Sequence, residues 1–254
     1  MGQAAVAGNY SCGLWNFQLD VAGSSIWSKA VGGGKKFNLS GKTLELGGSA
    51  FLRSEDFGAI GATAATTLVN MSVTGTHDQN SSLKRLGVFG EYYLGQQATI
   101  AAGVSAIGGN DIIALVRRKH SGAEAFARGV LYLSDNWAVS VRGDVQRSKL
   151  KYQGGAVTWN GFALTGGAEY LLPGTPLSLT LDGRFAQRRL GEGNGRFLSI
   201  NDKELLLGFR FDFGGNSADS LRARDRQGAA NTISVMSSKL PNVSYETMNV
   251  DLAP

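Results

Sequence analysis

The sequence lacks the features that mark several large classes of protein. Its 254 residues include four prolines and a single cysteine, Cys12, and one cysteine excludes an intrachain disulfide framework. We expect this thiol to be free or half-buried; a disulfide with another chain is the alternative. Glycine is frequent, with 36 residues, but it follows no three-residue period, which excludes collagen. No stretch approaches the roughly 18 consecutive apolar residues that indicate a membrane helix.

The side-chain clusters that many enzymes and metal sites need are missing as well. The two histidines, His77 and His120, stand far apart, so no Cys/His cluster suggests zinc. The glycine-lysine run at 32–36 has the wrong spacing for a phosphate-binding loop, and the acids are too dispersed for a calcium loop. We expect both histidines to be solvated loop residues. The prediction is therefore no enzyme activity, no catalytic residue, no metal and no cofactor.

The strongest pattern that is present lies at 204–213. On one side of a strand fall Leu205, Leu207, Phe209, Phe211 and Phe213; on the other fall Glu204, Leu206, Gly208, Arg210 and Asp212. Soluble half-buried strands also alternate, but here an aromatic-rich apolar side opposes charges of both signs. A membrane β-barrel requires this pattern, because its outer side meets lipid and its inner side meets water or polar groups.

This segment resembles the closing strand of bacterial outer-membrane β-barrels, which carries a glycine, then alternating hydrophobic residues, and ends in an aromatic residue. Gly208, Phe209, Phe211 and Phe213 match that pattern, and the resemblance implies that they form an assembly signal. In that family the strand usually ends the chain, whereas this chain continues to Pro254. The resemblance implies a porin-like or other small barrel of the Gram-negative outer membrane.

Weaker alternation elsewhere predicts about ten strands. They cover roughly 15–21, 43–53, 57–73, 85–94, 98–106, 123–133, 137–146, 162–172, 177–185 and 204–213. On the third strand, whose alternation is weak, we place Phe57, Ala59, Val69, Met71 and Val73 on the outer side. Long loops, at 23–42, 75–84, 108–122, 147–161 and 187–203, alternate with tight turns, as in barrels with short periplasmic turns and long outer loops.

The predicted fold class is therefore all-β: a transmembrane antiparallel up-and-down barrel over 13–213. A mobile segment at 1–12 precedes it and a periplasmic tail at 214–254 follows, so both termini are expected at the short-turn end. Residues 1–5 lack the basic region and apolar core of a secretory signal. Because export requires one, we expect the numbered chain to be the mature form.

Charges of both signs fall on the predicted inner side. They are Glu45, Arg53, Arg85, Glu91, Glu124, Arg128, Arg142, Asp144, Glu169, Asp182, Arg184, Glu204, Arg210 and Asp212. We expect Arg142 and Asp144 to neighbour Glu124 and Arg128. We also expect Asp182 and Arg184 to neighbour Arg210 and Asp212. Because roughly eight strands leave an interior just filled by side chains, we predict a lumen largely closed by ion pairs; a narrow water or solute path is the alternative.

The predicted outer loops are basic. Their principal cations are Lys35, Lys36, Arg117, Arg118, Lys119, Lys149, Lys151, Arg188 and Arg189. The net charge of +5 is compatible with nucleic acid, but this placement favours the phosphates of lipopolysaccharide; a solvated loop surface is the alternative. Aromatic girdles at the membrane interfaces are expected to draw on Trp15, Trp137, Tyr92, Tyr170 and Phe185, whereas Tyr93 points inward.

The tail beyond Phe213 is polar. Residues 217–226 suit a brief helix, and farther on Val243 and Tyr245 alternate with Asn242 and Ser244. An extended segment of this kind adds a strand to a partner's sheet; a disordered end is the alternative. The tail is therefore a candidate contact for a periplasmic or envelope protein.

The function expected from the sequence is non-enzymatic: an outer-membrane barrel with a structural or partner-binding role through its tail and basic loops. Its expected partners are outer-membrane lipid, lipopolysaccharide and an envelope protein, with no nucleic acid. The first alternative is a narrow porin-like channel for small solutes or ions. A barrel enzyme and a soluble all-β binding protein follow.

Overall fold

The computed structural model describes residues 2–32, 35–73, 79–113, 116–152, 155–191, 197–212 and 220–227. The strands are β1 (Gly2–Cys12), β2 (Trp15–Gly32), β3 (Lys35–Ser54), β4 (Gly58–Val73), β5 (Gln79–Leu94), β6 (Ala98–Ile113), β7 (Val116–Tyr132), β8 (Trp137–Tyr152), β9 (Gly155–Leu171), β10 (Leu177–Gly191) and β11 (Phe197–Phe211), followed by the helix α1 (Leu221–Gln227). All strands belong to one 11-stranded sheet in sequence order. The predicted all-β, up-and-down topology is confirmed.

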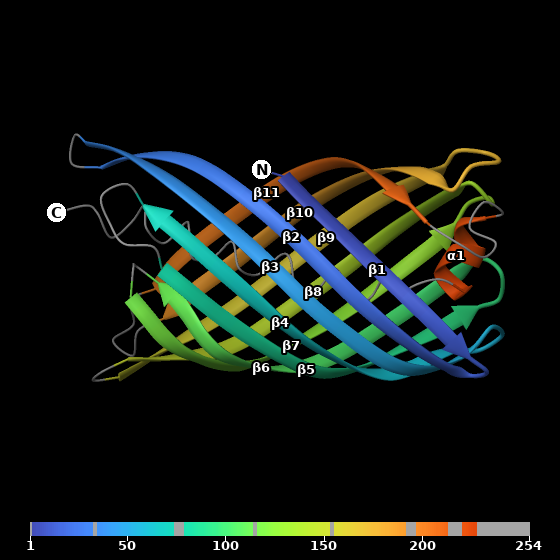
Figure 1. Ribbon diagram of the computed structural model, residues 1–254, viewed down its shortest axis with the longest axis horizontal. Helices are drawn as coiled ribbons and strands as arrows, with labels where there is room; N and C mark the ends of the chain where they lie inside the picture. The colour runs from blue at the N-terminus through green and yellow to red at the C-terminus, as the bar shows by residue number, and fades with distance from the viewer. Residues whose placement is uncertain are drawn as a thin grey trace.

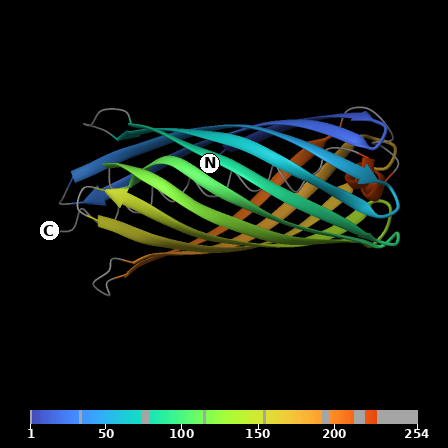
Figure 2. The same cartoon turned by 90° about the horizontal axis from the view of Figure 1, so that it is seen from below.

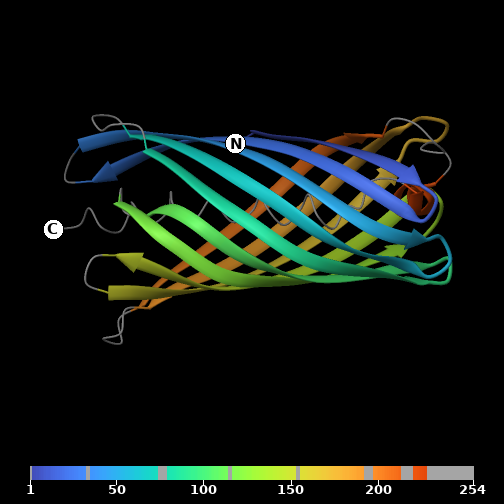
Figure 3. The same ribbon diagram turned by 60° about the horizontal axis from the view of Figure 1, so that its bottom comes forward.

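The sheet curls strongly about its long axis into an open half-barrel (Figures 1, 2 and 3). Strands β1 and β11 are its two edges in the strand order. Because every neighbouring pair is antiparallel and the number of strands is odd, both edge strands run in the same direction. The prediction of about ten strands missed one.

The missed strand is β1, at the segment predicted to be mobile. It pairs with β2 along its whole length, from Cys12↔Trp15 to Gly2↔Ser25. Alanine and glycine occupy much of 2–8, so this segment shows little contrast between its two faces and the alternation is hard to detect. Gly2 therefore lies opposite the middle of β2. The prediction that both termini lie at the short-turn end was wrong for the N-terminal segment.

The strands are joined at two ends of the sheet. At one end, here called the turn end, three of the turns contain a glycine with positive φ: Gly13, Gly95 and Gly174. A left-handed conformation costs glycine little because it has no Cβ. The opposite end is here called the hairpin end; there β2 ends at Gly32 and β3 begins at Lys35. Strand ends are as close in sequence here as at the turn end, so the predicted sorting of long and short connections by end was wrong.

The predicted long loops are largely strand. β2 and β3 pair without a break from Trp15↔Leu52 to Gly32↔Lys35, through almost all of the expected loop at 23–42. β10 and β11 likewise pair as far as Gly191↔Phe197. The apolar alternation ends where the outward side chains become polar, while the backbone pairing continues. Alternation records which side chains are apolar, and it does not record where the hydrogen bonds stop.

Burial alternates along the strands, which defines an inner and an outer face. The third predicted strand, now β4, was assigned the wrong register: Val69 and Ala59 are buried, with Val69 only 4% exposed, whereas Leu68 is 44% exposed. Its pairing explains the error. Ala59 lies opposite Arg53 of β3 and Glu91 of β5, so these neighbours fix its inward direction where the sequence of β4 itself shows little contrast.

The helix α1 lies at the turn end (Figures 1 and 3). The amide of Leu221 donates to the carbonyl of Asp135 in the β7–β8 turn at 2.8 Å. The Leu221 side chain packs with Val130 and Leu171 on the inner face. The brief helix expected within 217–226 is confirmed as Leu221–Gln227. Within the described residues, no helix is long and apolar enough to cross a membrane.

Candidate functional site

Buried ion pairs cross the inner face by spanning an intervening strand. Arg53 of β3 lies 3.9 Å from Glu91 of β5, over Ala59 of β4, which is the register partner of both. Arg85 of β5 lies 3.0 Å from Glu124 of β7. The small Ala59 between Arg53 and Glu91 leaves room for their head groups to meet, so these two charges pair across β4.

A polar chain extends the Arg85–Glu124 pair across the sheet. Arg85 Nη1 donates to the hydroxyl of Thr67 at 2.9 Å, and Thr67 lies 3.5 Å from Glu45 Oε2. These side chains are all buried. Charges removed from water are costly unless they are paired and hydrogen-bonded, so this row stabilises one arrangement of the strands.

A second charge cluster joins α1 to the last strands. Arg210 lies 3.4 Å from Glu169, 3.0 Å from Asp212 and 3.9 Å from Asp225 of α1. Arg224 of α1 lies 3.1 Å from Asp212 and 3.8 Å from Glu169. Two cations therefore share three carboxylates, and these ion pairs attach α1 to the last strands.

Further contacts hold α1 across the turn end. The Tyr132 hydroxyl of β7 donates to Asp225 Oδ2 at 2.7 Å, and Arg224 donates to the hydroxyl of Ser178. Arg224 is only 3% exposed. Burial lowers the pKa of its guanidinium from the ordinary value, and the carboxylate of Asp212 opposes this shift. The helix is thus attached by buried polar contacts as well as by the packing of Leu221.

Aromatic side chains fill the inner face beside these charges. Phe51, Phe89 and Phe126 form a buried cluster with Ala59 and Ala101, and the Phe51 and Phe89 rings meet edge to face at 5.8 Å. The guanidinium of Arg53 lies 4.8 Å from the centre of the Phe51 ring. The sequence analysis missed this cluster, although strand parity alone places Phe51 with the inward Arg53 and Phe89 with the inward Arg85.

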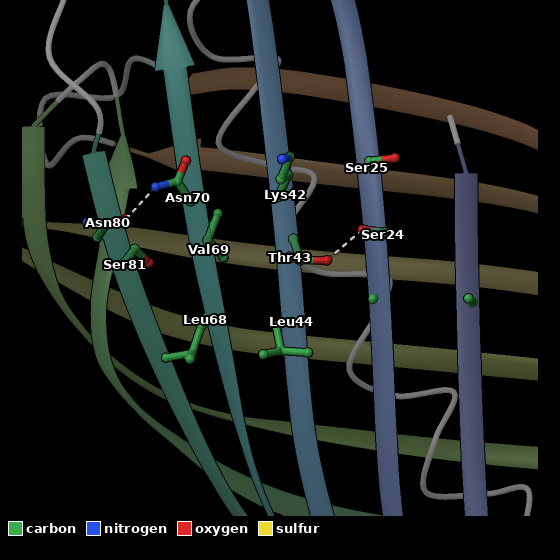
Figure 4. Close-up of a pocket in the computed structure, with 12 residues that line it drawn as sticks. Ser24, Ser25, Lys42, Thr43, Leu44, Leu68, Val69, Asn70, Asn80 and Ser81 are labelled. Atoms are coloured by element: carbon green, nitrogen blue, oxygen red, sulfur yellow. Dashed lines mark hydrogen bonds between the residues drawn. The ribbon is translucent and has the colours of Figure 1, made fainter.

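A pocket of about 810 Å³ lies in the hairpin half of β2–β5 (Figure 4). Most of its lining residues have outward parity, among them Lys42, Leu44, Leu68 and Asn70. The inward residues that also line it, Ser24, Thr43, Val69 and Ser81, are successive register partners across the four strands. This inward row carries serine, threonine and valine where the turn half carries phenylalanine and arginine.

The outer face carries a continuous apolar belt in its turn half. On β8 the outward positions are Trp137, Val139, Val141, Gly143 and Val145, and the next is Arg147. On β11 they are Phe211, Phe209, Leu207 and Leu205, and the next is Lys203. Most of these large side chains are exposed, as are those on β2, β5 and β10. Trp15, Tyr92 and Phe185, expected on the outer side, are confirmed there, and Tyr93 is confirmed as buried.

The belt ends at a common level on different strands. Lys42 lies opposite Asn70, and Asn70 lies opposite Asn80. Farther round, Arg147 lies opposite Asn160, which in turn lies opposite Arg189. All six side chains are exposed. Lys42, Asn70, Arg147 and Asn160 follow the last apolar outward residue of their strands, whereas on β5 and β10 the outward positions become polar one or two steps earlier, at Lys84 and Gln187. Because the six positions are in register within each group, they form a polar boundary on β3–β5 and on β8–β10.

All predicted inner charges lie on the buried or half-buried parity of their strands. Their expected neighbours were only partly right. Arg128 does lie opposite Arg142, and Arg142 pairs with Asp144 at 2.7 Å. On the last strands, however, Arg184 lies opposite Glu204 and pairs with it at 3.2 Å, while Arg210 lies opposite Ser178. The register of β10 and β11, which the sequence does not reveal, decides this. The sequence analysis also missed Arg224 and Asp225.

The predicted loop cations lie on strands instead. Lys35 and Lys36 belong to β3, Arg117, Arg118 and Lys119 to β7, Lys149 and Lys151 to β8, and Arg188 and Arg189 to β10. Lys119, Lys149, Lys151 and Arg189 are exposed. His120, expected as a solvated loop residue, is instead buried on β7. Its register partners are Gly109 and Leu150, and neither is an acid.

Several predicted residues fall outside the described part of the chain, namely His77, Phe213, Val243 and Tyr245. Of the strand expected to act as an assembly signal, Phe209 and Phe211 are exposed on the outer face and Gly208 lies on the inner parity. Neither a protein-family model nor a curated protein matches this chain. The described part of the chain therefore combines a charged inner face, which α1 covers at the turn end, with an apolar outer belt that ends at polar residues.

Proposed function

We propose that this chain is a non-enzymatic transmembrane β-barrel of the Gram-negative outer membrane. Its lumen is closed in the turn half by ion pairs, aromatic rings and α1. Its role is structural or partner-binding, with lipopolysaccharide around its hairpin half and an envelope protein as the partner of its tail. The single observation that carries the proposal is the exposed apolar belt with its in-register polar boundary.

The belt is too apolar to face water. Leu205, Leu207 and Phe209 are 77%, 79% and 75% exposed, and burying such a side chain fully is favourable by about 1.5–3 kcal/mol. Monomeric soluble proteins rarely expose an apolar patch larger than a few hundred Å². Lipid tails can cover this outer surface while the inner charges keep their partners. The exposed belt therefore disfavours a soluble all-β binding protein.

The length of the belt also fits a bilayer. A tilted membrane strand needs about 9–11 residues to cross the hydrocarbon region. On β8 the apolar outward positions run from 137 to 145, and on β5 they run from 86 to 94. The strands are longer, at 16 residues each, so their hairpin halves extend the wall beyond the hydrocarbon.

Charge supports one orientation of the barrel. The turns contribute acids, namely Glu55, Asp56 and Asp135, whereas exposed lysines and arginines gather in the hairpin half. Lipopolysaccharide phosphates attract cations at the outer surface. The hairpin half therefore faces outward, and the turn end with α1 faces the periplasm.

Closure of the wall is part of this proposal. Lipid tails offer no hydrogen bonds, so an open sheet edge within the hydrocarbon would leave backbone groups unsatisfied. β1 and β11 therefore meet in the membrane. Because they run in the same direction, their seam is a parallel ladder, in contrast to the antiparallel pairing of the other strands.

Insertion into vesicles tests the membrane placement. Val141 faces outward at the middle of the belt, and Val141→Arg is expected to destabilise the inserted barrel by about 2–4 kcal/mol. The matched control is Asn70→Arg, at an exposed outward position of the polar boundary itself, where the expected cost is about 0–1 kcal/mol. The measurement is urea unfolding of protein that floats with phospholipid vesicles. Equal effects of the two arginines, or wild-type protein that stays at the bottom of the gradient, contradict the proposal.

A narrow channel is the second candidate, because the small inward side chains of Ser24, Thr43 and Ser81 occupy less of the lumen than the phenylalanines and arginines of the turn half. Conductance across a planar bilayer distinguishes it from a sealed barrel, using protein confirmed as inserted and protease-resistant. The sealed barrel is expected to be silent, because Arg224, Arg210 and their carboxylates occupy the turn end. Discrete, reproducible current steps from the wild-type protein support the channel instead.

A further inference from the structure

Two lysines of the outer face lie directly opposite each other. Lys119 of β7 is the register partner of Lys151 of β8, and both side chains are exposed. Opposed residues of an antiparallel pair have Cβ atoms about 4.5–5.5 Å apart, and like charges in this position are destabilising. An anion between the two ammonium groups would remove this repulsion and so stabilise the pairing of β7 with β8.

Three further cations extend this pair into a patch. Lys149 follows on β8 and is diagonal to Lys119; Arg147 is next on the same strand. Arg147 lies opposite Asn160, and Asn160 lies opposite Arg189 of β10. We call Lys119, Arg147, Lys149, Lys151 and Arg189 the basic patch. All five side chains are exposed.

Acids do not balance this patch within the described side chains. The carboxylates of the strands, such as Glu124 and Asp144 on β7 and β8, lie on the inner parity, where arginines pair with them. The exposed acids, Glu55, Asp56 and Asp135, belong to the turn end. Carboxylates of the same chain therefore neutralise the inner arginines. The cations of the basic patch are exposed, so an anion from outside the chain can neutralise them.

The patch stands immediately beyond the apolar belt. Arg147 follows the exposed Val145, and Asn160 precedes the exposed Phe162. On the turn side of the patch the outward side chains are small: Ala127 of β7 lies opposite Gly143 of β8. A Cβ at Gly143 would meet nothing within 4 Å, so the outer surface has open space there. An anion with apolar chains fits this surface, because its head group meets the cations while its chains lie along the belt.

We propose that the basic patch binds the phosphate groups of a phosphorylated glycolipid of the outer leaflet. This inference rests on the proposed function, which places lipopolysaccharide around the whole hairpin half, and it assigns the phosphate contacts to five residues of one surface. Lysine and arginine form short, strong hydrogen bonds with phosphate oxygens. Three ammonium groups around one position and a guanidinium beside them suit a head group that carries more than one phosphate.

Binding to a bisphosphorylated lipid A by protein folded in a neutral detergent tests the proposal. The test variant combines Lys119→Gln, Lys149→Gln and Lys151→Gln. The matched control combines Lys42→Gln, Lys84→Gln and Lys203→Gln, which removes the same charge from exposed lysines just beyond the belt on three separate strands. The patch variant is expected to bind roughly a hundredfold more weakly than wild type, and the control to stay within about threefold.

Three results overturn the proposal. Equal loss in both variants shows attraction by net charge alone. Equal affinity of the wild type for lipid A and for its dephosphorylated form shows that phosphate is not recognised. Displacement of lipid A by inorganic phosphate at equimolar concentration shows a free-phosphate site without a lipid requirement.

The binding measurement in detergent is separate from insertion into vesicles. A wild-type protein that inserts but shows no preference for phosphorylated lipid rejects the basic patch alone. A protein that fails to float with vesicles rejects the proposed function, and phosphate-dependent binding in detergent then remains as a surface property of the sheet. Retained strand content by circular dichroism in both variants shows that the glutamines leave the fold intact.

Discussion

The inner face of the sheet has two contrasting halves. In the turn half, Phe51, Phe89 and Phe126 pack against buried arginines and carboxylates, and α1 covers the end. In the hairpin half of β2–β5, the inward row consists of Ser24, Thr43, Val69 and Ser81. The backbone pairing is continuous through both halves. The comparison teaches that one continuous sheet carries large and charged inner side chains in one half and small uncharged ones in the other, without a change in strand geometry.

The largest difference between the halves is expected from an unpaired buried charge. Glu124→Ala leaves Arg85 buried without its carboxylate 3.0 Å away, and such a loss costs about 3–5 kcal/mol. In the hairpin half, Ser81→Ala removes one hydroxyl that donates to the carbonyl of Asn110, and this loss is expected to lower the free energy of unfolding by about 0.5–1.5 kcal/mol. Urea unfolding of both variants in the same vesicles measures the two costs. Similar values mean that the ion pairs add nothing to the turn half.

A smaller difference is expected when a side chain is enlarged in each half. Ser105 is buried beside Gly87 in the packed half, where an added Cβ at Gly87 would already lie 2.4 Å from the Ser105 hydroxyl. Ser105→Leu is therefore expected to cost about 1–3 kcal/mol through overpacking. Ser81→Leu lies in the inward row of small side chains and is expected to cost less than about 1 kcal/mol beyond the loss of its hydrogen bond. A larger cost at Ser81, from the same unfolding measurement, means that this row is packed as tightly as the turn half.

The smallest effect concerns the attachment of α1 to the packed half. Tyr132→Phe removes the hydroxyl that donates to Asp225 at 2.7 Å. Because Asp225 is only half-buried and keeps its contact with Arg210, the expected cost is about 1 kcal/mol. Hydrogen exchange of 221–227 is expected to quicken while exchange in β8 is unchanged. The exposed Tyr92 gives the control, and Tyr92→Phe is expected to change neither rate. Equal rates in wild type and Tyr132→Phe mean that this contact does not hold the helix.

The two faces of the strands were largely predictable. Alternation placed Arg142, Asp144 and Glu204 inward and Val141 and Leu207 outward, because each residue's direction follows from its own strand parity. It failed where the two faces offered no contrast. β1 was missed because of its alanines and glycines, and β4 was reversed because its middle is small on both sides.

The partners of the charges were less predictable than their direction. The sequence indicated that Arg53 and Glu91 lie inward, but not that they meet over Ala59. It placed Arg184 near Arg210 and Asp212, whereas the register gives it Glu204. No local pattern predicts where Arg224 and Asp225 dock, because their partners are distant in the chain. The same holds for the pocket, whose lining comes from five strands.

The sequence by itself determined that this is an antiparallel, up-and-down β-protein with a charged inner side and an apolar outer side. It did so because a period of two residues is a local property of a strand. The tertiary structure alone decided how far the strands extend, which charges pair, where α1 docks and which outer cations gather into the basic patch. These features depend on the stagger between strands and on the curl of the sheet, and both are set by packing among all eleven strands together.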